Sequence, residues 1–187
     1  MSTDEFFEEV IIAGFGGQGI ILAGRLLAQT AMKEGYEVTF MPSYGAEVRG
    51  GTANCMVIIA EKEIACPVIS KPDSLIAMNK ASLDKFAPRL NNSGLLVINS
   101  SLIDSYPQPN ETIEIIAVPA DELAVQLGSQ KVANMVALGA YLQKRGYLSP
   151  DEAVACLAQT IAEHYHHTLT VNAQALRRGA EFVSRES

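Results

Sequence analysis

The chain has 187 residues, a hydrophobic share of 48% and a formal net charge of −7, which suits one domain with a sizeable core of its own. Its basic residues are dispersed apart from Arg177 and Arg178, so the charge pattern excludes the basic stripe typical of nucleic-acid-binding proteins. The sequence contains no apolar run of the roughly 18 residues that a membrane span needs and starts without the basic segment of a signal peptide. We therefore expect a cytoplasmic protein with neither nucleic acid nor membrane as a partner.

The first predicted elements are a strand at residues 10–13, a glycine turn at 14–19 and a helix at 20–34. Glycines allow the backbone to turn sharply and to approach a ligand closely, and the N-terminus of a helix favours an anion. The turn has the spacing G-x-G-x-x-G, which is a weak signal alone because glycine loops also make purely structural turns. A site for a phosphate-bearing ligand and a structural turn are therefore both open at this point.

The second predicted strand, residues 37–41, lacks the acid that a nicotinamide or flavin dinucleotide requires. In such sites an Asp or Glu at the C-terminal end of the second strand holds the ribose. Here Glu37 lies at the start of the strand and the end of the strand is apolar. The sequence therefore disfavours NAD but leaves another phosphate-bearing ligand possible.

The segment 42–52 follows this strand directly, and loops after strand C-termini line the ligand crevice of a doubly wound sheet. We therefore expect the segment to lie beside the glycine turn. Arg49, between glycines, is suited to bidentate contact with a phosphate or carboxylate, and Ser43 and Tyr44 offer hydrogen-bond donors. The alternative is a solvated turn with a surface pair between Glu47 and Arg49.

Downstream, residues 52–60 and 63–69 are predicted as two strands joined by a hairpin turn, which makes the sheet mixed. The remaining expected strands are 73–78, 95–99 and 112–118, and the expected helices are 80–90, 131–145, one starting after Ser149, and 172–184. This alternation predicts a single domain over residues 1–187, with a Rossmann-like three-layer α/β/α fold and a mixed, mostly parallel sheet.

Few other residues suggest chemistry. Asn134, in the first turn of the helix 131–145, offers an amide to the same crevice, although a polar residue there is ordinary. The sequence resembles no nucleophile elbow, Walker lysine or catalytic dyad, so we assign no catalytic residue.

The cysteines and histidines show no metal-binding pattern. Cys55, Cys66 and Cys156 lie far apart without a C-x-x-C pair, which argues against a disulfide framework, a zinc ribbon or an iron–sulfur cluster held by this chain and predicts buried reduced thiols. The histidines within 164–167 are spaced i, i+2 and i+3, which does not direct three imidazoles at one zinc ion. We therefore predict no metal site and a solvated helix end at the histidines.

Three ordered motifs, at residues 14–19 with Gly24, at 44–55 and at 134–139, closely resemble the gamma subunit of the 2-oxoacid:ferredoxin oxidoreductases. The resemblance runs over nearly the whole chain. The motif Arg-Gly-Gly-Thr-Ala-Asn-Cys, residues 49–55, is most similar to the corresponding motif of the 2-oxoglutarate enzymes. The 2-oxoisovalerate and pyruvate enzymes are next in similarity.

The resemblance implies an enzyme whose chemistry is shared among alpha, beta, gamma and ferredoxin-like delta subunits, so that this chain is inactive alone. Thiamine diphosphate with its Mg, and the iron–sulfur clusters, belong to the partner subunits. Ferredoxin accepts the electrons, and coenzyme A takes the acyl group.

In this family the gamma-type domain helps to bind coenzyme A, whose pyrophosphate suits the glycine turn. A stand-alone NAD- or FAD-dependent enzyme and a structural subunit whose glycine turn binds nothing are the two alternatives. The residues that we predict to bind the cofactor are Gly14, Gly16, Gly17, Gln18, Gly19, Ser43, Tyr44, Arg49, Gly50, Gly51 and Asn134.

Overall fold

Six strands form one sheet in the order β2-β3-β1-β4-β5-β6 in the computed structural model, which describes residues 5–43, 52–106 and 112–186. The strands are β1 (Phe7–Phe15), β2 (Glu37–Ser43), β3 (Thr52–Ala60), β4 (Ser74–Ala77), β5 (Leu95–Asn99) and β6 (Glu114–Val118). The α-helices are α1 (Ile20–Lys33), α2 (Lys80–Phe86), α3 (Ala120–Gln126), α4 (Ala133–Arg145), α5 (Pro150–Thr160) and α6 (Leu169–Glu186).

The sheet is mixed because β3 runs against its two neighbours. It pairs antiparallel with β1 on one side and with β2 on the other, whereas β1, β4, β5 and β6 pair parallel in that order. The predicted mixed, mostly parallel sheet is confirmed. The sequence did not indicate, however, that β3 lies between the first two strands, so that β1 and β2 point the same way without touching.

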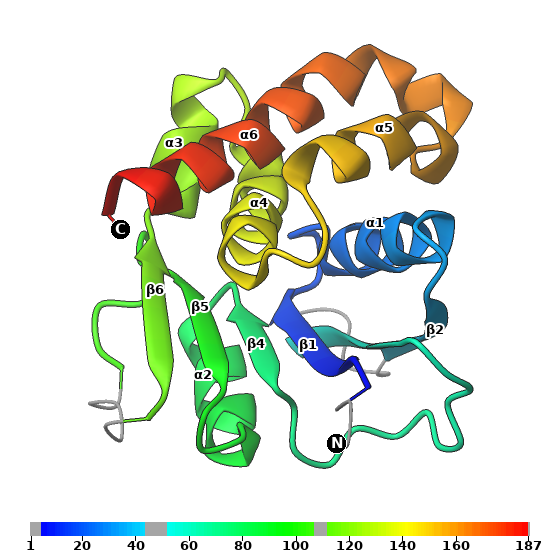
Figure 1. Cartoon of the computed structure of the whole chain (residues 1–187). Helices are drawn as coiled ribbons and strands as arrows, with labels where there is room; N and C mark the ends of the chain where they lie inside the picture. Colours follow the sequence, from blue (N-terminus) through cyan, green and yellow to red (C-terminus); the bar gives the residue numbers. More distant parts are fainter. Residues whose placement is uncertain (1–4, 44–51, 107–111, 187) are drawn as a thin grey trace.

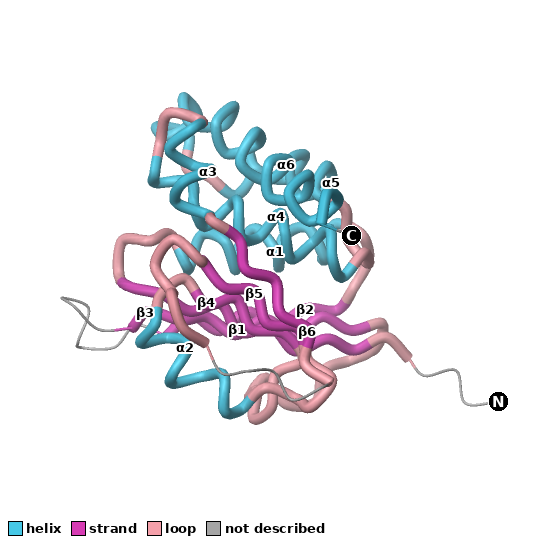
Figure 2. Tube along the Cα trace, turned by 90° about the vertical axis from the view of Figure 1, so that its left-hand side faces the viewer, coloured by secondary structure: helices cyan, strands magenta, loops and turns pink. Residues whose placement is uncertain are grey.

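The molecule has three layers (Figures 1 and 2). Figure 2 shows the strands as the middle layer, with α1, α3, α4, α5 and α6 on one side and α2 on the other. The predicted three-layer α/β/α arrangement is therefore confirmed, with unequal outer layers.

Each face of the sheet packs against its own apolar core because side chains alternate along a strand. Val10 and Ile12 of β1 belong to the larger cluster under α1 and α4. Ile11 and Ala13 belong to the smaller cluster, in which Phe86 of α2 also lies. The central strands are thus buried on both faces, which explains their continuous apolar runs.

The predicted strand at residues 63–69 is wrong. Residues 61–73 form no strand and connect the end of β3 to the start of β4. Both edges of β3 are already paired, with β1 and β2, so a hairpin partner has no free edge there. Pro67 and Pro72 also remove two backbone donors from the segment. Its buried Ile69 packs into the smaller core instead.

Several other predictions need adjustment. The predicted helix 80–90 consists of α2 and a short 3₁₀ turn, Ala87–Arg89. The helix α3 was not predicted, and the histidines lie in a 3₁₀ segment, Glu163–Thr168, between α5 and α6. Cys55 and Cys156 are buried as expected, but Cys66 is exposed. Among the described residues, no helix has both the length and the apolar character that crossing a membrane requires.

Local end signals in the sequence are confirmed at two helices. Ser149 caps α5 in a reciprocal capping box with Glu152, and Pro150 occupies the first turn. Gly146 ends α4 in the left-handed conformation with φ 74°. These ends are determined by neighbouring residues and so could be read from the sequence.

Candidate functional site

The candidate site lies at the C-terminal ends of β1 and β4, beside the glycine turn. These strands are adjacent and parallel, but the helices that follow them lie on opposite faces of the sheet, α1 on the five-helix side and α2 on the other (Figure 2). In open α/β sheets, ligands bind where successive connections leave in opposite directions. The glycine turn lies at this point.

The glycine turn takes a conformation that only glycine adopts easily. Gly17 has φ 94° and Gly19 has φ 71°, in the left-handed region that side chains disfavour. Gly19 is the N-cap of α1, and no side chain caps the helix there. The first turn of α1 contains no acidic residue. The N–H groups of this helix end are therefore suited to an anion.

Gln18 holds the turn together through its own side chain. Its Oε1 accepts hydrogen bonds from Phe15 N at 2.7 Å and from Asn79 Nδ2 at 3.2 Å. Its Nε2 donates to Met78 O at 3.4 Å. The side chain thus bridges the ends of β1 and β4. Gln18 is among the predicted ligand contacts, but the structure shows most of its hydrogen-bonding capacity used inside the protein.

Asn134 of α4 also contacts the turn. Its Nδ2 donates to Gly19 O at 2.9 Å, so two of the three sequence motifs meet directly. A Cβ atom at Gly19 would lie 2.5 Å from this nitrogen, so a side chain there would displace the amide of Asn134. Asn134 is buried, and its Oδ1 has no partner among the described residues. Because an unsatisfied buried oxygen costs about 1–3 kcal/mol, a donor from water or ligand would be stabilising there.

A pocket of about 210 Å³ opens beside the turn. It brings together the loops that follow β1, β4, β5 and β6 and the start of α4. Its lining residues are Gly17, Gln18, Met78, Leu102, Asp121, Gln130, Lys131 and Ala133. Gly17 faces open space, since a Cβ atom built on it meets nothing within 4 Å. The pocket therefore combines an accessible backbone, an ammonium group, a carboxylate and apolar surface.

The segment 42–52 is described only at its ends. Ser43 is exposed at the end of β2, and Thr52, the first residue of β3, pairs with Phe15 at the start of the glycine turn. Both ends thus lie at the edge of the sheet where the turn lies. The predicted binding residues Tyr44, Arg49, Gly50 and Gly51 lie outside the described residues, and their roles stay predictions.

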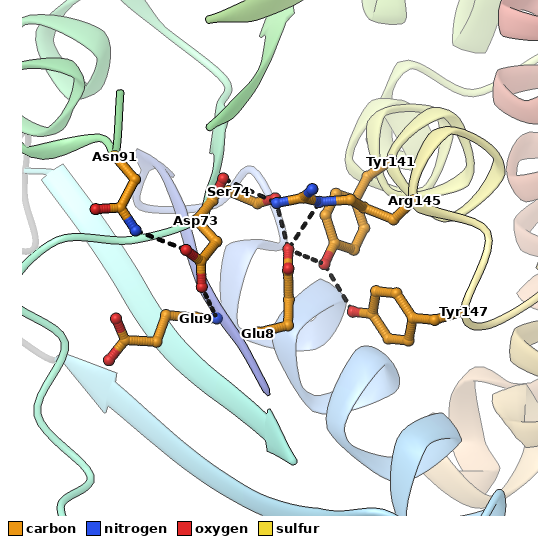
Figure 3. A network of polar contacts seen from close by, with 8 residues as sticks. All are labelled: Glu8, Glu9, Asp73, Ser74, Asn91, Tyr141, Arg145 and Tyr147. Atoms are coloured by element: carbon orange, nitrogen blue, oxygen red, sulfur yellow. Dashed lines mark hydrogen bonds and ion pairs between the residues drawn. The ribbon is translucent and has the colours of Figure 1, made fainter. Parts of the chain in front are cut away.

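A second polar cluster lies near the N-terminal ends of β1 and β4 (Figure 3). Glu8 is buried there, and its Oε1 is 2.9 Å from Arg145 Nε and accepts hydrogen bonds from Ser74 Oγ at 2.7 Å and Tyr141 OH at 3.2 Å. Burial raises the pKa of Glu8, while the bond from Ser74 and the charge of Arg145 oppose the rise. Because every partner is internal, this cluster anchors the end of α4 to the sheet.

The thiols and imidazoles do not form a reactive site in the described part of the chain. Burial raises the pKa of Cys55 to about 12, which keeps it a thiol packed against Gly24. His166 Nε2 lies 2.9 Å from Ile161 O and 3.1 Å from Ala158 O, at the end of α5. The described residues contain no cluster of three His, Cys, Asp or Glu side chains that could hold a metal ion.

Six of the eight residues that line the pocket are absent from the predicted site, and three of them are polar: Asp121, Gln130 and Lys131. Asp121 carried a signal, because acids are favoured in the first turn of a helix and Asp121 and Glu122 follow Pro119. The helix itself is only seven residues long and has too little periodicity to be recognised. Gln130 and Lys131 are exposed. Lys131 begins the predicted helix 131–145, but nothing in the sequence places either side chain beside the glycine turn.

Comparison with known proteins identifies the family. The family model of pyruvate ferredoxin/flavodoxin oxidoreductase matches residues 9–182. The chain belongs to this family. The resemblance to gamma subunits is confirmed by a solved structure, the gamma subunit of a keto/oxoacid ferredoxin oxidoreductase from Geobacter sulfurreducens. It has 29% identity and a TM-score of 0.81, and the match covers 95% of this chain and 99% of that one.

Two curated relatives in the pyruvate ferredoxin/flavodoxin oxidoreductase family differ in length. The 2-oxoglutarate synthase subunit KorC of Methanothermobacter thermautotrophicus is 32% identical, with 98% of both chains covered. The ketoisovalerate oxidoreductase subunit VorA of Methanothermobacter marburgensis is 40% identical over 72% of this chain. The match spans only 28% of VorA.

The fold also matches a 2-oxoglutarate:ferredoxin oxidoreductase of Magnetococcus marinus, solved with 2-oxoglutarate, coenzyme A and succinyl-CoA bound. Its TM-score is 0.83 at 24% identity, covering 96% of this chain and 31% of that one. At this identity the match supports the fold alone.

Proposed function

We propose that this chain is the gamma subunit of a 2-oxoacid:ferredoxin oxidoreductase and contributes to coenzyme A binding during oxidative decarboxylation of the 2-oxoacid to an acyl-CoA. The observation that carries the proposal is the uncapped N-terminus of α1, preceded by the open Gly17, beside a pocket at the point where the connections of the sheet diverge. This arrangement suits the pyrophosphate of coenzyme A.

The residues of this site fit part of coenzyme A. Backbone N–H groups of the turn and the ammonium of Lys131 supply positive charge for phosphates. Pockets for whole small molecules have volumes of about 300–1,000 Å³, so a pocket of about 210 Å³ holds a portion of the coenzyme. When bound, coenzyme A supplies the thiol that takes the acyl group. This chain's residues hold the phosphates and orient the molecule.

The 2-oxoacid that we favour is 2-oxoglutarate. The support is the match to KorC, whose name specifies 2-oxoglutarate synthase, over nearly the full length of both chains. The ketoisovalerate oxidoreductase is the second candidate, because VorA has the higher identity over the part that matches. A pyruvate enzyme is the third.

The partners that we propose are alpha, beta and ferredoxin-like delta subunits. The resemblance to the family supports them: those chains would hold thiamine diphosphate with its Mg and the iron–sulfur clusters, with ferredoxin as the electron acceptor. The complex would be cytoplasmic.

A stand-alone NAD- or FAD-dependent enzyme is less well supported. The second strand of a dinucleotide fold lies beside the first, so that its terminal acid reaches the ribose. Here β3 separates β2 from β1, which places the end of β2 two strand spacings, about 10 Å, from the glycine turn. The end of β2 at Met41–Ser43 contains no acid.

The test is kinetic and uses the reconstituted complex. We expect Gly17→Val, which places a side chain where phosphate would lie, and Arg49→Ala, which removes a cation predicted from the sequence, to raise the KM for coenzyme A about ten- to a hundredfold. The KM for the 2-oxoacid should change little. Gly35→Val is the matched control, because Gly35 also has positive φ and open surroundings but lies between α1 and β2.

The isolated chain should have no 2-oxoacid oxidation activity and no iron–sulfur chromophore. Turnover of 2-oxoglutarate with ferredoxin by this chain alone would contradict the subunit assignment. Unchanged constants for coenzyme A in both well-assembled variants would remove the glycine turn as the phosphate site.

A further inference from the structure

Asp121 is a fixed carboxylate in the lining of the pocket, in the first turn of α3 after β6. Asn99, which is fully buried at the end of β5, donates from Nδ2 to Asp121 Oδ2 at 3.0 Å. Asn99 is itself fixed, because its Oδ1 accepts from Ala120 N at 3.2 Å and from Ser101 N at 3.3 Å. Asp121 therefore presents its carboxylate to the pocket in a defined orientation.

One oxygen of this carboxylate remains available for a ligand. Asn99 uses Oδ2, and no hydrogen bond to Oδ1 is found within the described part of the chain. Asp121 is part-exposed and lines the pocket. A carboxylate oxygen only accepts hydrogen bonds, so the ligand group beside it must be a donor such as a hydroxyl or an amide N–H.

The pocket therefore has two chemically different ends. Gly17 follows β1 and Asp121 follows β6, and these strands are three spacings apart in the sheet, about 14 Å. The turn end is suited to phosphate, whereas Asp121 repels it because like charges disfavour one another. Met78 and Leu102, which lie after β4 and β5, add apolar surface between these ends.

This division distinguishes the two arms of coenzyme A, if coenzyme A is the ligand as proposed above. The adenosine arm carries a 3′-phosphate, which the carboxylate would repel. The pantetheine arm is neutral and offers a hydroxyl, two amide N–H groups and a pair of methyl groups. We infer that Asp121 is a specificity-determining residue that accepts a hydrogen bond from the pantetheine arm.

The test measures equilibrium binding to the reconstituted complex by calorimetry, with three probes: coenzyme A, 4′-phosphopantetheine and adenosine 3′,5′-bisphosphate. The variant is Asp121→Asn, whose amide oxygen can still accept from Asn99 while its NH₂ replaces the available acceptor. The control is Glu122→Gln, which makes the same change of charge on the neighbouring exposed residue of α3 outside the pocket.

In Asp121→Asn, the Kd for coenzyme A and for 4′-phosphopantetheine should rise about ten- to a hundredfold. The Kd for adenosine 3′,5′-bisphosphate should not change, and Glu122→Gln should bind all three probes like the wild type. A purely structural role for Asp121 would lower the thermal stability of the complex without this selectivity. If Asp121→Asn does not assemble, Asp121→Ser removes the charge with a smaller side chain and is held to the same expectation.

Tighter binding of coenzyme A by the variant would overturn the inference, because it would place phosphate beside Asp121. An equal loss for all three probes, or no change for any of them, would also overturn it. Failure of the proposed function gives a different result: the wild-type complex itself would not bind coenzyme A.

Discussion

Asn79 connects the glycine turn to the beginning of α2 by using both ends of its side-chain amide. Its Nδ2 donates to Gln18 Oε1 at 3.2 Å, and its Oδ1 accepts from Ser82 N at 2.8 Å as the N-cap of α2. Asn79 is buried. The loops on the two sides of the crevice are therefore held in one hydrogen-bonded unit.

Replacing Gln18 by Ala should loosen this unit. The variant leaves Phe15 N and Asn79 Nδ2 without their acceptor. A lost hydrogen bond typically costs about 0.5–1.5 kcal/mol of stability, and the cost is higher when a buried group is left unpaired. We expect a free energy of unfolding lower by about 1–3 kcal/mol, measured by urea denaturation, together with weaker coenzyme A binding. Gln130→Ala, at another pocket residue that is exposed, should leave stability nearly unchanged. Equal stability of the two variants would contradict the bridging role of Gln18.

Two glycines allow α4 and α6 to approach each other backbone to backbone. A Cβ atom at Gly139 would lie 1.9 Å from Leu176 O, and one at Gly179 would lie 1.9 Å from Val136 O. Gly139→Ala and Gly179→Ala should each lower the free energy of unfolding by about 1–3 kcal/mol through overpacking. In a helix free of such contact, Ala would instead be stabilising by about 1 kcal/mol. The sign of the change in denaturation midpoint decides between these outcomes.

The buried carboxylate of Glu8 should make stability depend on pH. Burial raises the pKa of Glu8 in the folded state above the ordinary value of 4.5. At a pH between 4.5 and this raised pKa, the folded state therefore binds more protons than the unfolded state. The stability contributed by protonated Glu8 is then complete below about pH 4.5 and is lost as the pH rises through the raised value. Glu8→Gln removes this dependence. The free energy of unfolding of the variant, minus that of the wild type, should increase from pH 4.5 to 7.

Arg145→Gln provides the complementary measurement. The charge of Arg145 lowers the pKa of Glu8, so its removal should raise that pKa further and extend the loss of stability to higher pH. Glu9, whose pKa is also raised by burial and by the nearby charge of Asp73, contributes in the same direction and remains in all three proteins. A difference curve for Glu8→Gln that is flat with pH would show that Glu8 does not titrate in this range.

Part of the candidate site was predictable because its determinants are local. A strand that runs into a glycine turn and then into a helix is encoded by neighbouring residues, and β1, the turn and α1 were all found. The absence of an acid at the end of β2 was equally readable. The predicted strand 63–69 is wrong because the apolar pattern of this segment does not show that both edges of β3 are occupied.

By itself, the sequence determined the glycine turn and the uncapped start of α1, because backbone freedom and helix ends depend on a few consecutive residues. Only the tertiary structure decided which distant residues share the crevice. Asn134 is 115 positions from Gly19 along the chain and still donates to its carbonyl, and Asp121 and Gly17 line one pocket. These residues meet because the four parallel strands β1, β4, β5 and β6 end at the same edge of the sheet. The order of the strands depends on which apolar faces pack together, and no single segment of the sequence encodes it.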